Sequence, residues 1–368
     1  MRKSALYTIV NSAGTNAIDA FERDPDSGKL TYMGRYQTGG TGDPQVGGVQ
    51  SHAIVADKGH LYAVNPGDGT ISSFAIGKDG TLTLLNTVSS GGMAPGSLAL
   101  SGQILYVANQ GAPPGTTPAR PASYSGFRIH HDGTLSPIPR STIALKDGDS
   151  PGEILFNHNG KRLIACRLGG NLIDVFDVNG EGCLVNAGSL RQPGPFGAVF
   201  HPALHDKLMV CLANPDAGPP GVVAVNLSDH GAPSVINAVI NPAQMDPCWL
   251  AITGNGKHLW ASAFIPMDLT LYAVGPNGSL TEVGKNEPTP GPNGSTDIVL
   301  DSADRFMYRL RVFDVATVGQ VPRVPIIEVF KVTGHTANGG LELVQALSLD
   351  YDPGLTESGI MGLAVVNL

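Results

Sequence analysis

A unit of about 40 to 55 residues recurs along the chain, and this repeat limits the possible folds more than any other feature. Each copy holds a short apolar strand, a turn, a second apolar strand and a hairpin that often contains Asp-Gly or Asn-Gly. Six copies begin at Ser51, Pro95, Pro151, Pro195, Pro247 and Ser295. Since one four-stranded unit of this kind cannot bury its own faces, the copies are expected to pack side by side.

The seventh copy is divided between the two ends of the chain. Residues 5–34 lack an innermost strand, and residues 362–368 have the pattern of one. Pairing these segments closes a ring and leaves no free sheet edge. The sequence therefore predicts a single all-β domain over residues 1–368. Its expected fold is a seven-bladed β-propeller closed by N- and C-terminal strands in one blade.

Composition agrees with many short strands joined by tight turns. The 368 residues include 48 Gly and 28 Pro, and only 15% are charged. The dipeptides Asp79-Gly80, Asp132-Gly133 and Asn277-Gly278 are typical of hairpin turns. No segment keeps a helical period, which again favours an all-β chain.

Charge and hydropathy argue against several classes of partner. The net charge is -8 and Lys/Arg-rich stretches are absent, so nucleic acid is not expected. No apolar run approaches the roughly 18 to 20 residues that cross a membrane, and the first residues do not read as a secretory signal. Cys166, Cys183, Cys211 and Cys248 form no CxxC motif, so we expect reduced thiols and a cytoplasmic location. A monomer or weak homo-oligomer is expected.

Comparison of the repeats with one another selects the candidate site. The first residue before each innermost apolar triplet should lie at one mouth of the central channel. In the seven copies this residue is Gly362, His52, Ser97, Glu153, Gly197, Trp249 and Asp297. Glycine and serine need no functional explanation there, but a histidine, two acids and a tryptophan do.

The ends of the second strands are expected near the same mouth. They include Asn65, Asn109, Arg167, Ala263 and Arg311. Asn is typical at such a turn, whereas Arg is unusual. Glu153 and Arg167 are fourteen residues apart, as are Asp297 and Arg311, so each acid is predicted to face an Arg across neighbouring strands. The pairs are either structural salt bridges or parts of a binding site.

In the functional interpretation, Arg167 and Arg311 hold a substrate carboxylate or a developing oxyanion. Glu153 and His52 then move the proton, because imidazole titrates near neutral pH. Arg167, Arg311, Glu153 and His52 are the candidate catalytic residues.

Other residues are candidates for binding substrate. Trp249 and Phe196 form an apolar wall or else plug the channel, and Cys248 is a weak candidate nucleophile. The remaining candidates are Asp297, Ser97, Asn65 and Asn109. A metal held by His52, Glu153 and Asp297 is chemically possible, but no local ligand motif supports it, so neither a metal nor a cofactor is expected.

The blades resemble the lactonase family of seven-bladed propellers, most clearly in the turns NHNGKRL (from Asn157) and GNGKHLW (from Gly254). That family includes 6-phosphogluconolactonases and 3-carboxy-cis,cis-muconate cyclases. The resemblance implies a functional acid at Glu153. The chain departs from the family at Ser97, where a histidine is usual, and at Pro195-Phe196-Gly197, where an arginine is usual.

Together these features predict a metal-independent lactone hydrolase or lactonizing enzyme that acts on a small carboxylate or lactone at the channel mouth. Pro-rich segments after Gln110, Asn214 and Val312 are predicted lids over that mouth. Two alternatives stay open: a non-catalytic ligand-binding or scaffold propeller, and another lyase or isomerase in the same pocket.

Overall fold

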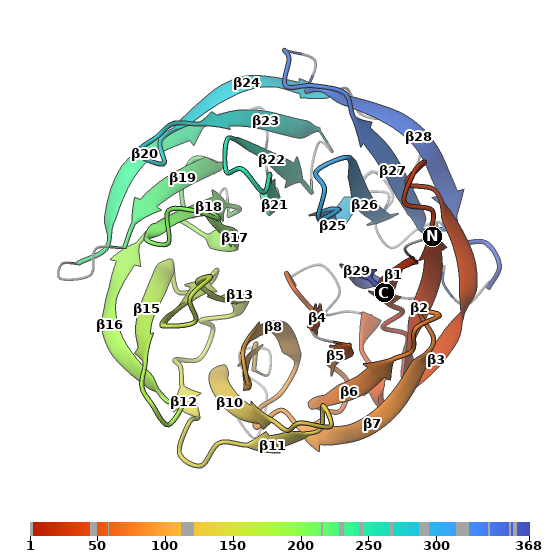
Figure 1. Ribbon diagram of the computed structural model, residues 1–368. Helices are drawn as coiled ribbons and strands as arrows, with labels where there is room; N and C mark the ends of the chain where they lie inside the picture. The colour runs from red at the N-terminus through yellow and green to blue at the C-terminus, as the bar shows by residue number, and fades with distance from the viewer. Residues whose placement is uncertain are drawn as a thin grey trace.

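A computed structural model shows seven antiparallel sheets arranged as blades around a ring, which confirms the predicted propeller (Figure 1). The structure describes residues 3–44, 50–57, 59–111, 121–214, 216–227, 232–242, 246–264, 268–286, 294–313, 324–337, 339–352, 355 and 359–368. Much of the predicted lids after Gln110 and Val312 lies outside these residues. Within them, no helix is long and apolar enough to cross a membrane.

Each blade is given from its innermost strand outward. Blade 1 contains β29 (Met361–Asn367), β1 (Ser4–Ile9), β2 (Gly14–Arg23) and β3 (Leu30–Gly42). Blade 2 contains β4 (Ile54–Asp57), β5 (His60–Asn65), β6 (Thr70–Ile76) and β7 (Leu82–Ser89). Blade 3 contains β8 (Pro95–Ser101), β9 (Ile104–Asn109) and β10 (Ser123–Ile129), which pairs with both β11 (Leu135–Pro137) and β12 (Ile143–Ala144).

The other four blades have four strands each. Blade 4 contains β13 (Pro151–Phe156), β14 (Arg162–Arg167), β15 (Leu172–Val178) and β16 (Leu184–Arg191). Blade 5 contains β17 (Pro195–Phe200), β18 (Lys207–Leu212), β19 (Gly221–Asn226) and β20 (Ser234–Ile240). Blade 6 contains β21 (Pro247–Ile252), β22 (His258–Ala263), β23 (Leu269–Val274) and β24 (Leu280–Asn286). Blade 7 contains β25 (Gly294–Leu300), β26 (Phe306–Phe313), β27 (Ile326–Val332) and β28 (Leu341–Ser348).

The ring closes inside blade 1, as the split repeat predicts. β29 pairs antiparallel with β1, with Ser4 opposite Asn367 and Tyr7 opposite Ala364. The two chain ends therefore lie side by side in one sheet (Figure 1). This pairing supplies the inner edge of the N-terminal strands with a partner.

The core lies between neighbouring blades. Second strands are covered by other blades on both faces, so they read as continuous apolar runs rather than as an alternating pattern. In β5, for example, Leu61, Tyr62, Ala63 and Val64 are all buried. This explains why the second strand is the most recognisable part of each repeat.

Aromatic side chains on second strands also hydrogen-bond the next blade. In four junctions a ring hydroxyl or indole N–H donates to a glycine carbonyl in the outer hairpin of the following blade. The pairs are Tyr7–Gly80 (2.9 Å), Tyr106–Gly182 (2.9 Å), Trp260–Gly339 (3.0 Å) and Tyr308–Gly28 (2.9 Å). All four glycines have positive φ, which side chains disfavour, so these turns need glycine for their shape while their carbonyls join the blades.

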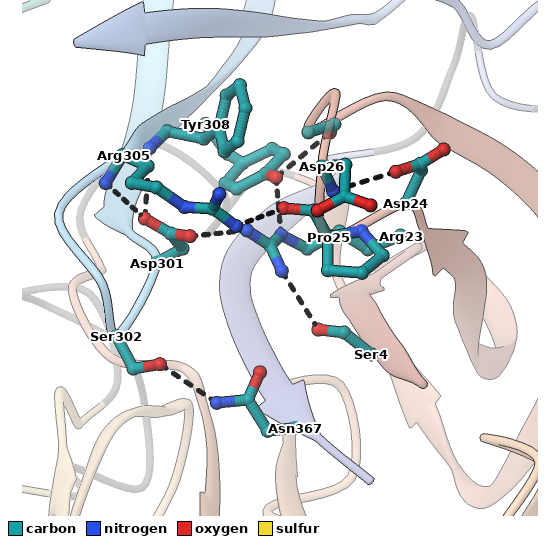
Figure 2. A network of polar contacts seen from close by, with 12 residues as sticks. Ser4, Arg23, Asp24, Pro25, Asp26, Asp301, Ser302, Arg305, Tyr308 and Asn367 are labelled. Carbon is teal, nitrogen blue, oxygen red and sulfur yellow. Dashed lines mark hydrogen bonds and ion pairs between the residues drawn. The ribbon is translucent and has the colours of Figure 1, made fainter. Parts of the chain in front are cut away.

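A buried ionic network joins blade 7 to blade 1, and Figure 2 shows the Arg23 guanidinium within it. Arg23 forms an ion pair with Asp301, and the two side chains are 3% and 4% exposed. Its Nε donates to the Tyr308 hydroxyl (2.6 Å) and its Nη1 donates to Ser4 Oγ (3.3 Å). Asp301 also accepts the backbone N–H of Phe306 (2.9 Å), so removing Arg23 leaves a buried carboxylate without its cation.

We predict that Arg23→Met lowers the free energy of unfolding by about 3 to 5 kcal/mol, the usual effect of breaking one side of a buried ion pair. Urea unfolding followed by far-ultraviolet circular dichroism measures this change. Arg128, whose guanidinium donates to Glu181 O in an exposed contact, provides the control variant Arg128→Met, for which we expect a change below about 1 kcal/mol. Equal losses for the two variants would contradict the assignment.

Candidate functional site

Residues 50–52 lead into β4 near the centre of the ring (Figure 1) and are hydrogen-bonded to two other blades. The indole Nε1 of Trp249 in blade 6 donates to Gln50 O (3.0 Å). The backbone N–H of Ser51 donates to Gly152 O in blade 4 (3.2 Å). This segment therefore lies across the mouth of the channel and joins blades that are not neighbours in the ring.

His52 and Glu153 form the closest ionic contact at this mouth. His52 Nδ1 lies 2.5 Å from Glu153 Oε1, and Glu153 Oε2 accepts the backbone N–H of Ala198 (3.2 Å). The Glu153 side chain is 0% exposed, whereas that of His52 is 40% exposed. His52 also has a φ of 56°, in the left-handed region that is unfavourable for side chains. The contact thus holds a buried carboxylate against an accessible imidazole.

The electrostatics of the mouth favour a protonated His52. Burial lowers its pKa, but the charge and hydrogen bond of Glu153, with a smaller contribution from Asp297, outweigh burial and raise the pKa to about 9. His52 is therefore a stronger base than an ordinary histidine.

Asp297 is the second acid at the mouth. Its Oδ1 accepts the N–H of Ile298 (2.8 Å) and its Oδ2 accepts the N–H of Leu363 in blade 1 (2.7 Å). Burial raises its pKa to about 7, although the His52 charge and these two N–H groups act in the opposite direction. Asp297 is thus close to half-ionised near neutral pH.

A cavity of about 310 Å³ follows the inner strands from this cluster. Its polar lining includes Ser51, His52 and Asp297, and Trp249 stands beside them. The rest of the described lining is apolar, from residues such as Leu98 and Val299, and it contains neither Lys nor Arg. The volume suits a small ring or a short chain.

Three of the polar residues at the mouth also have a structural role. Ser97 Oγ accepts the N–H of Ile154 (3.1 Å), just as Glu153 and Asp297 accept N–H groups of the following inner strands. Each bond joins the start of one inner strand to the next blade. Of these three, only Glu153 also binds a histidine.

The predicted pair Glu153–Arg167 is wrong. A β-bulge at the start of β13 shifts the register, so that Glu153 lies opposite Cys166 and Arg167 lies opposite Pro151. Arg167 instead binds Asp149 and Asp174, each at 2.8 Å. A shift of one residue moves a side chain to the other face of a strand.

The predicted pair Asp297–Arg311 is wrong for the same reason. Asp297 lies opposite Leu310, after register shifts near Ser295. Arg311 is 0% exposed, and its Nη1 donates to Glu328 Oε1 (2.7 Å), while Arg309 binds the other oxygen of Glu328. The contacts therefore support the structural interpretation, in which both arginines form ion pairs inside a blade.

The described hydrogen bonds of Asn65 and Asn109 hold strands and blades together, and Asn65 also accepts a bond from Asn16 of blade 1. Asn65 Nδ2 donates to Ser72 Oγ (2.8 Å), and Asn109 Nδ2 donates to Ser123 Oγ (3.2 Å). Both asparagines are fully buried. The structure thus places both side chains in contacts that hold second and third strands together.

Phe196 and Trp249 are both buried and pack edge to face, with ring centroids 5.7 Å apart, and Trp249 lines the cavity. Cys248 is buried, and its Sγ donates to Asp246 Oδ1 (3.4 Å). Burial, together with the Asp246 charge, raises the pKa of this thiol well above its usual value, so it stays protonated and is a poor nucleophile. All four cysteines are free.

Two features of the site were not expected from the sequence. One is the hydrogen bonding of residues 50–52 across the mouth, since Gln50 stands before the repeat and no periodic position marks it. The other is that His52 reaches Glu153 from two blades away. In the part of the chain that the structure describes, no three His, Cys, Asp or Glu side chains are arranged to hold a metal ion.

Comparison with known proteins agrees with this architecture. A family model described as "Lactonase, 7-bladed beta-propeller" matches residues 46–117. A 6-phosphogluconolactonase from Yersinia enterocolitica is 27% identical over 306 residues, which cover 73% of this chain and 81% of that relative. A 6-phosphogluconolactonase from Xenorhabdus nematophila is 30% identical over 102 residues, which cover 28% of this chain and 29% of that relative.

Solved structures are similar over nearly the whole chain. The periplasmic gluconolactonase of Pseudomonas aeruginosa has a TM-score of 0.73 at 17% identity, covering 98% of this chain and 99% of that one. A protein from Lactobacillus plantarum has a TM-score of 0.73 at 19% identity, with complete coverage of both chains (100% each). At these identities the similarity establishes the fold.

The His52 contact predicts a pH dependence of stability. Its pKa is about 9 in the folded protein against an ordinary 6.5, so the contact stabilises the fold fully below about pH 6.5, and this contribution is lost as the pH rises through about 9. Because the side chain is 40% exposed and partly screened by solvent, we expect a loss on the order of 1 kcal/mol. Urea unfolding between pH 6 and pH 10 measures it.

His52→Gln is the matched variant for this experiment. It removes the titrating group, so its free energy of unfolding is expected to fall less than that of the wild type over this range. Asp297 also titrates, near pH 7, and loss of the His52 charge raises its pKa in the variant, so both proteins are compared in an Asp297→Asn background. Parallel pH curves for the two proteins would rule out the raised pKa of His52.

Proposed function

We propose that this chain, a seven-bladed β-propeller similar to lactonases, hydrolyses a small lactone, with His52 and Glu153 handling the proton. The observation that carries the proposal is the 2.5 Å contact between the accessible imidazole and the buried carboxylate. A carboxylate that orients an imidazole and increases its basicity is a recurrent arrangement for general acid–base catalysis.

The arrangement suggests a definite proton path. Glu153 occupies Nδ1 of His52, which leaves Nε2 to exchange a proton with water. The oxygen of that water bonds to the lactone carbonyl carbon while its proton passes to Nε2. When the tetrahedral intermediate breaks the ring C–O bond, the same nitrogen returns the proton to the departing oxygen, and the product is a hydroxy acid.

The relatives support the hydrolytic direction. Two of them are named as 6-phosphogluconolactonases, and one of these aligns over most of both chains. We propose the same reaction class for this chain. A carboxylate clamp made by Arg167 and Arg311 is not part of the proposal, because both guanidinium groups bind acids inside blades 4 and 7.

A purely structural role for the cluster is the competing hypothesis. Glu153 accepts an N–H group of the next blade as Ser97 and Asp297 do, and under this hypothesis it serves only to join inner strands. Under this hypothesis the propeller is non-catalytic, and substitutions of Glu153 or His52 lower its stability without affecting any turnover.

Since the four free cysteines agree with a reducing compartment, we also propose a cytoplasmic location.

We predict that Glu153→Gln and His52→Gln each lower kcat for lactone hydrolysis by about 10²- to 10⁴-fold, the usual contribution of a positioned acid–base group. Hydrolysis of glucono-δ-lactone and of 6-phosphogluconolactone, followed by acid release in a weakly buffered solution with a chelator present, measures it. With a pKa of about 9, His52 also predicts that the wild-type kcat/KM rises toward pH 9.

Glu181→Gln, on an exposed outer turn, is the control and should keep wild-type kcat. Thermal unfolding of every variant separates loss of catalysis from loss of fold. If the two mouth variants remain folded and retain full turnover, the acid–base assignment fails. If they lose stability and the wild type hydrolyses no lactone, the structural hypothesis is preferred.

A further inference from the structure

Trp249 contacts the segment that carries His52 from the far side of the channel mouth. In the described part of the chain, the backbone of residues 50–52 is hydrogen-bonded to three other blades, blades 3, 4 and 6. The pairs are Leu98 N–H with His52 O (3.0 Å), Ser51 N–H with Gly152 O (3.2 Å) and the Trp249 indole N–H with Gln50 O (3.0 Å). In Figure 1, β21 lies across the ring centre from β4, so Trp249 restrains the segment from the side opposite to its own blade.

The segment depends on these bonds because it lies outside the regular strands. β4 begins at Ile54, after residues 50–52, and His52 has a φ of 56°. A non-glycine residue in the left-handed region is unfavourable and persists only where its surroundings hold it there. Loss of one restraint is therefore expected to move His52 relative to Glu153.

The indole donor is itself held in place. Trp249 is 1% exposed and packs edge to face against Phe196 of blade 5, with ring centroids 5.7 Å apart. A Cβ placed on Gly197 would lie 2.0 Å from Cys248 O and 3.4 Å from Trp249 Cα, so blade 5 lies directly against the start of β21. The donor therefore has little freedom to follow Gln50 O if the segment moves.

The chemistry proposed for His52 depends on where its ring lies. Glu153 must contact Nδ1 for Nε2 to exchange protons with water, and His52 lines the cavity. The charges that face the imidazole are those of Glu153 and, with a smaller contribution, Asp297. Since the attraction between charges falls with distance, moving the ring away from Glu153 lowers its basicity and also misaligns it with a substrate.

We propose that Trp249 is a positioning residue for His52: its indole N–H, acting through Gln50 O, fixes the imidazole against Glu153. The inference rests on the proposed lactonase function and adds a residue that supports it without moving a proton. The structural alternative is that the bond only joins blades, as the Trp260 indole does where it donates to Gly339 O (3.0 Å).

The chain's two tryptophans provide a matched pair of variants. Both are buried in blade 6, belong to the same apolar cluster and donate one indole hydrogen bond of 3.0 Å to a backbone carbonyl. Trp249→Phe and Trp260→Phe each remove that bond and a similar apolar area, so both should lower the melting temperature. Only Trp249→Phe should change the behaviour of His52.

We expect Trp249→Phe to lower the limiting kcat for glucono-δ-lactone at least about tenfold and to leave KM within about threefold, because the acid–base group is displaced. The rise of kcat/KM with pH should move at least about one pH unit below that of the wild type, since His52 loses part of the Glu153 attraction. Trp260→Phe should keep the wild-type kcat, KM and pH profile. Equal effects of the two variants on kcat, or an unchanged pH profile for Trp249→Phe, would overturn the proposal.

A second replacement separates the hydrogen bond from the shape of the cavity wall, because Trp249 also lines the cavity. Replacement of Trp249 by β-(3-benzothienyl)alanine keeps the two-ring shape and puts sulfur in place of the N–H group. This protein should reproduce both the fall in kcat and the shift of the pH profile. Wild-type values of both would mean that the ring and not its hydrogen bond matters, which contradicts the proposal.

Nuclear magnetic resonance distinguishes failure of this proposal from failure of the proposed function. The His52 imidazole, assigned by comparison with His52→Gln, should titrate near pH 9 in the wild type and at least about one pH unit lower in Trp249→Phe. If the wild type hydrolyses neither glucono-δ-lactone nor 6-phosphogluconolactone, the lactonase assignment falls, and this shift by itself supports the positioning role. The same His52 titration in both proteins overturns that role.

Discussion

Antiparallel pairing of β29 with β1 connects the two ends of the chain in one sheet, and the geometry at the centre of the ring depends on it. A blade packs against its neighbours on both sides, so an open ring would leave two blades with an uncovered face. The ion pair of Arg23 with Asp301 and the bond from Tyr308 to Gly28 strengthen the same junction. Closure therefore fixes the seven inner strands around one channel and sets the distances between their first residues.

The same constraint explains why the channel mouth can hold unfavourable features. Inner strands are joined blade to blade by Ser97, Glu153 and Asp297, and residues 50–52 add bonds across the mouth. A frame held at so many points can keep His52 in a left-handed conformation and Glu153 fully buried. Such strained and poorly compensated groups cluster at functional sites more often than elsewhere.

Charged residues have different kinds of contact inside the blades and at the channel mouth. Inside blade 4, Arg167 forms ion pairs with Asp149 and Asp174, and inside blade 7, Arg309 and Arg311 both bind Glu328. At the mouth, by contrast, the carboxylates outnumber the cations, and the amide of Gln50 has no partner among the described residues. Arginines that bind carboxylates inside the blades and acids that outnumber cations at the mouth form the contrast on which the functional proposal stands.

The sequence by itself determined the all-β class, the number of blades, the closure by both termini and the residues that begin each inner strand, because these follow from a repeat and from local apolar patterns. It placed His52, Glu153 and Asp297 at one mouth but paired the acids with Arg167 and Arg311, which was wrong. Spacing alone does not reveal a β-bulge, and one extra residue turns a side chain to the other face. Only the tertiary structure decided that His52 meets Glu153 from two blades away and that Gln50 is buried without a partner in the described chain, since contacts between distant blades depend on the closed ring and not on local sequence.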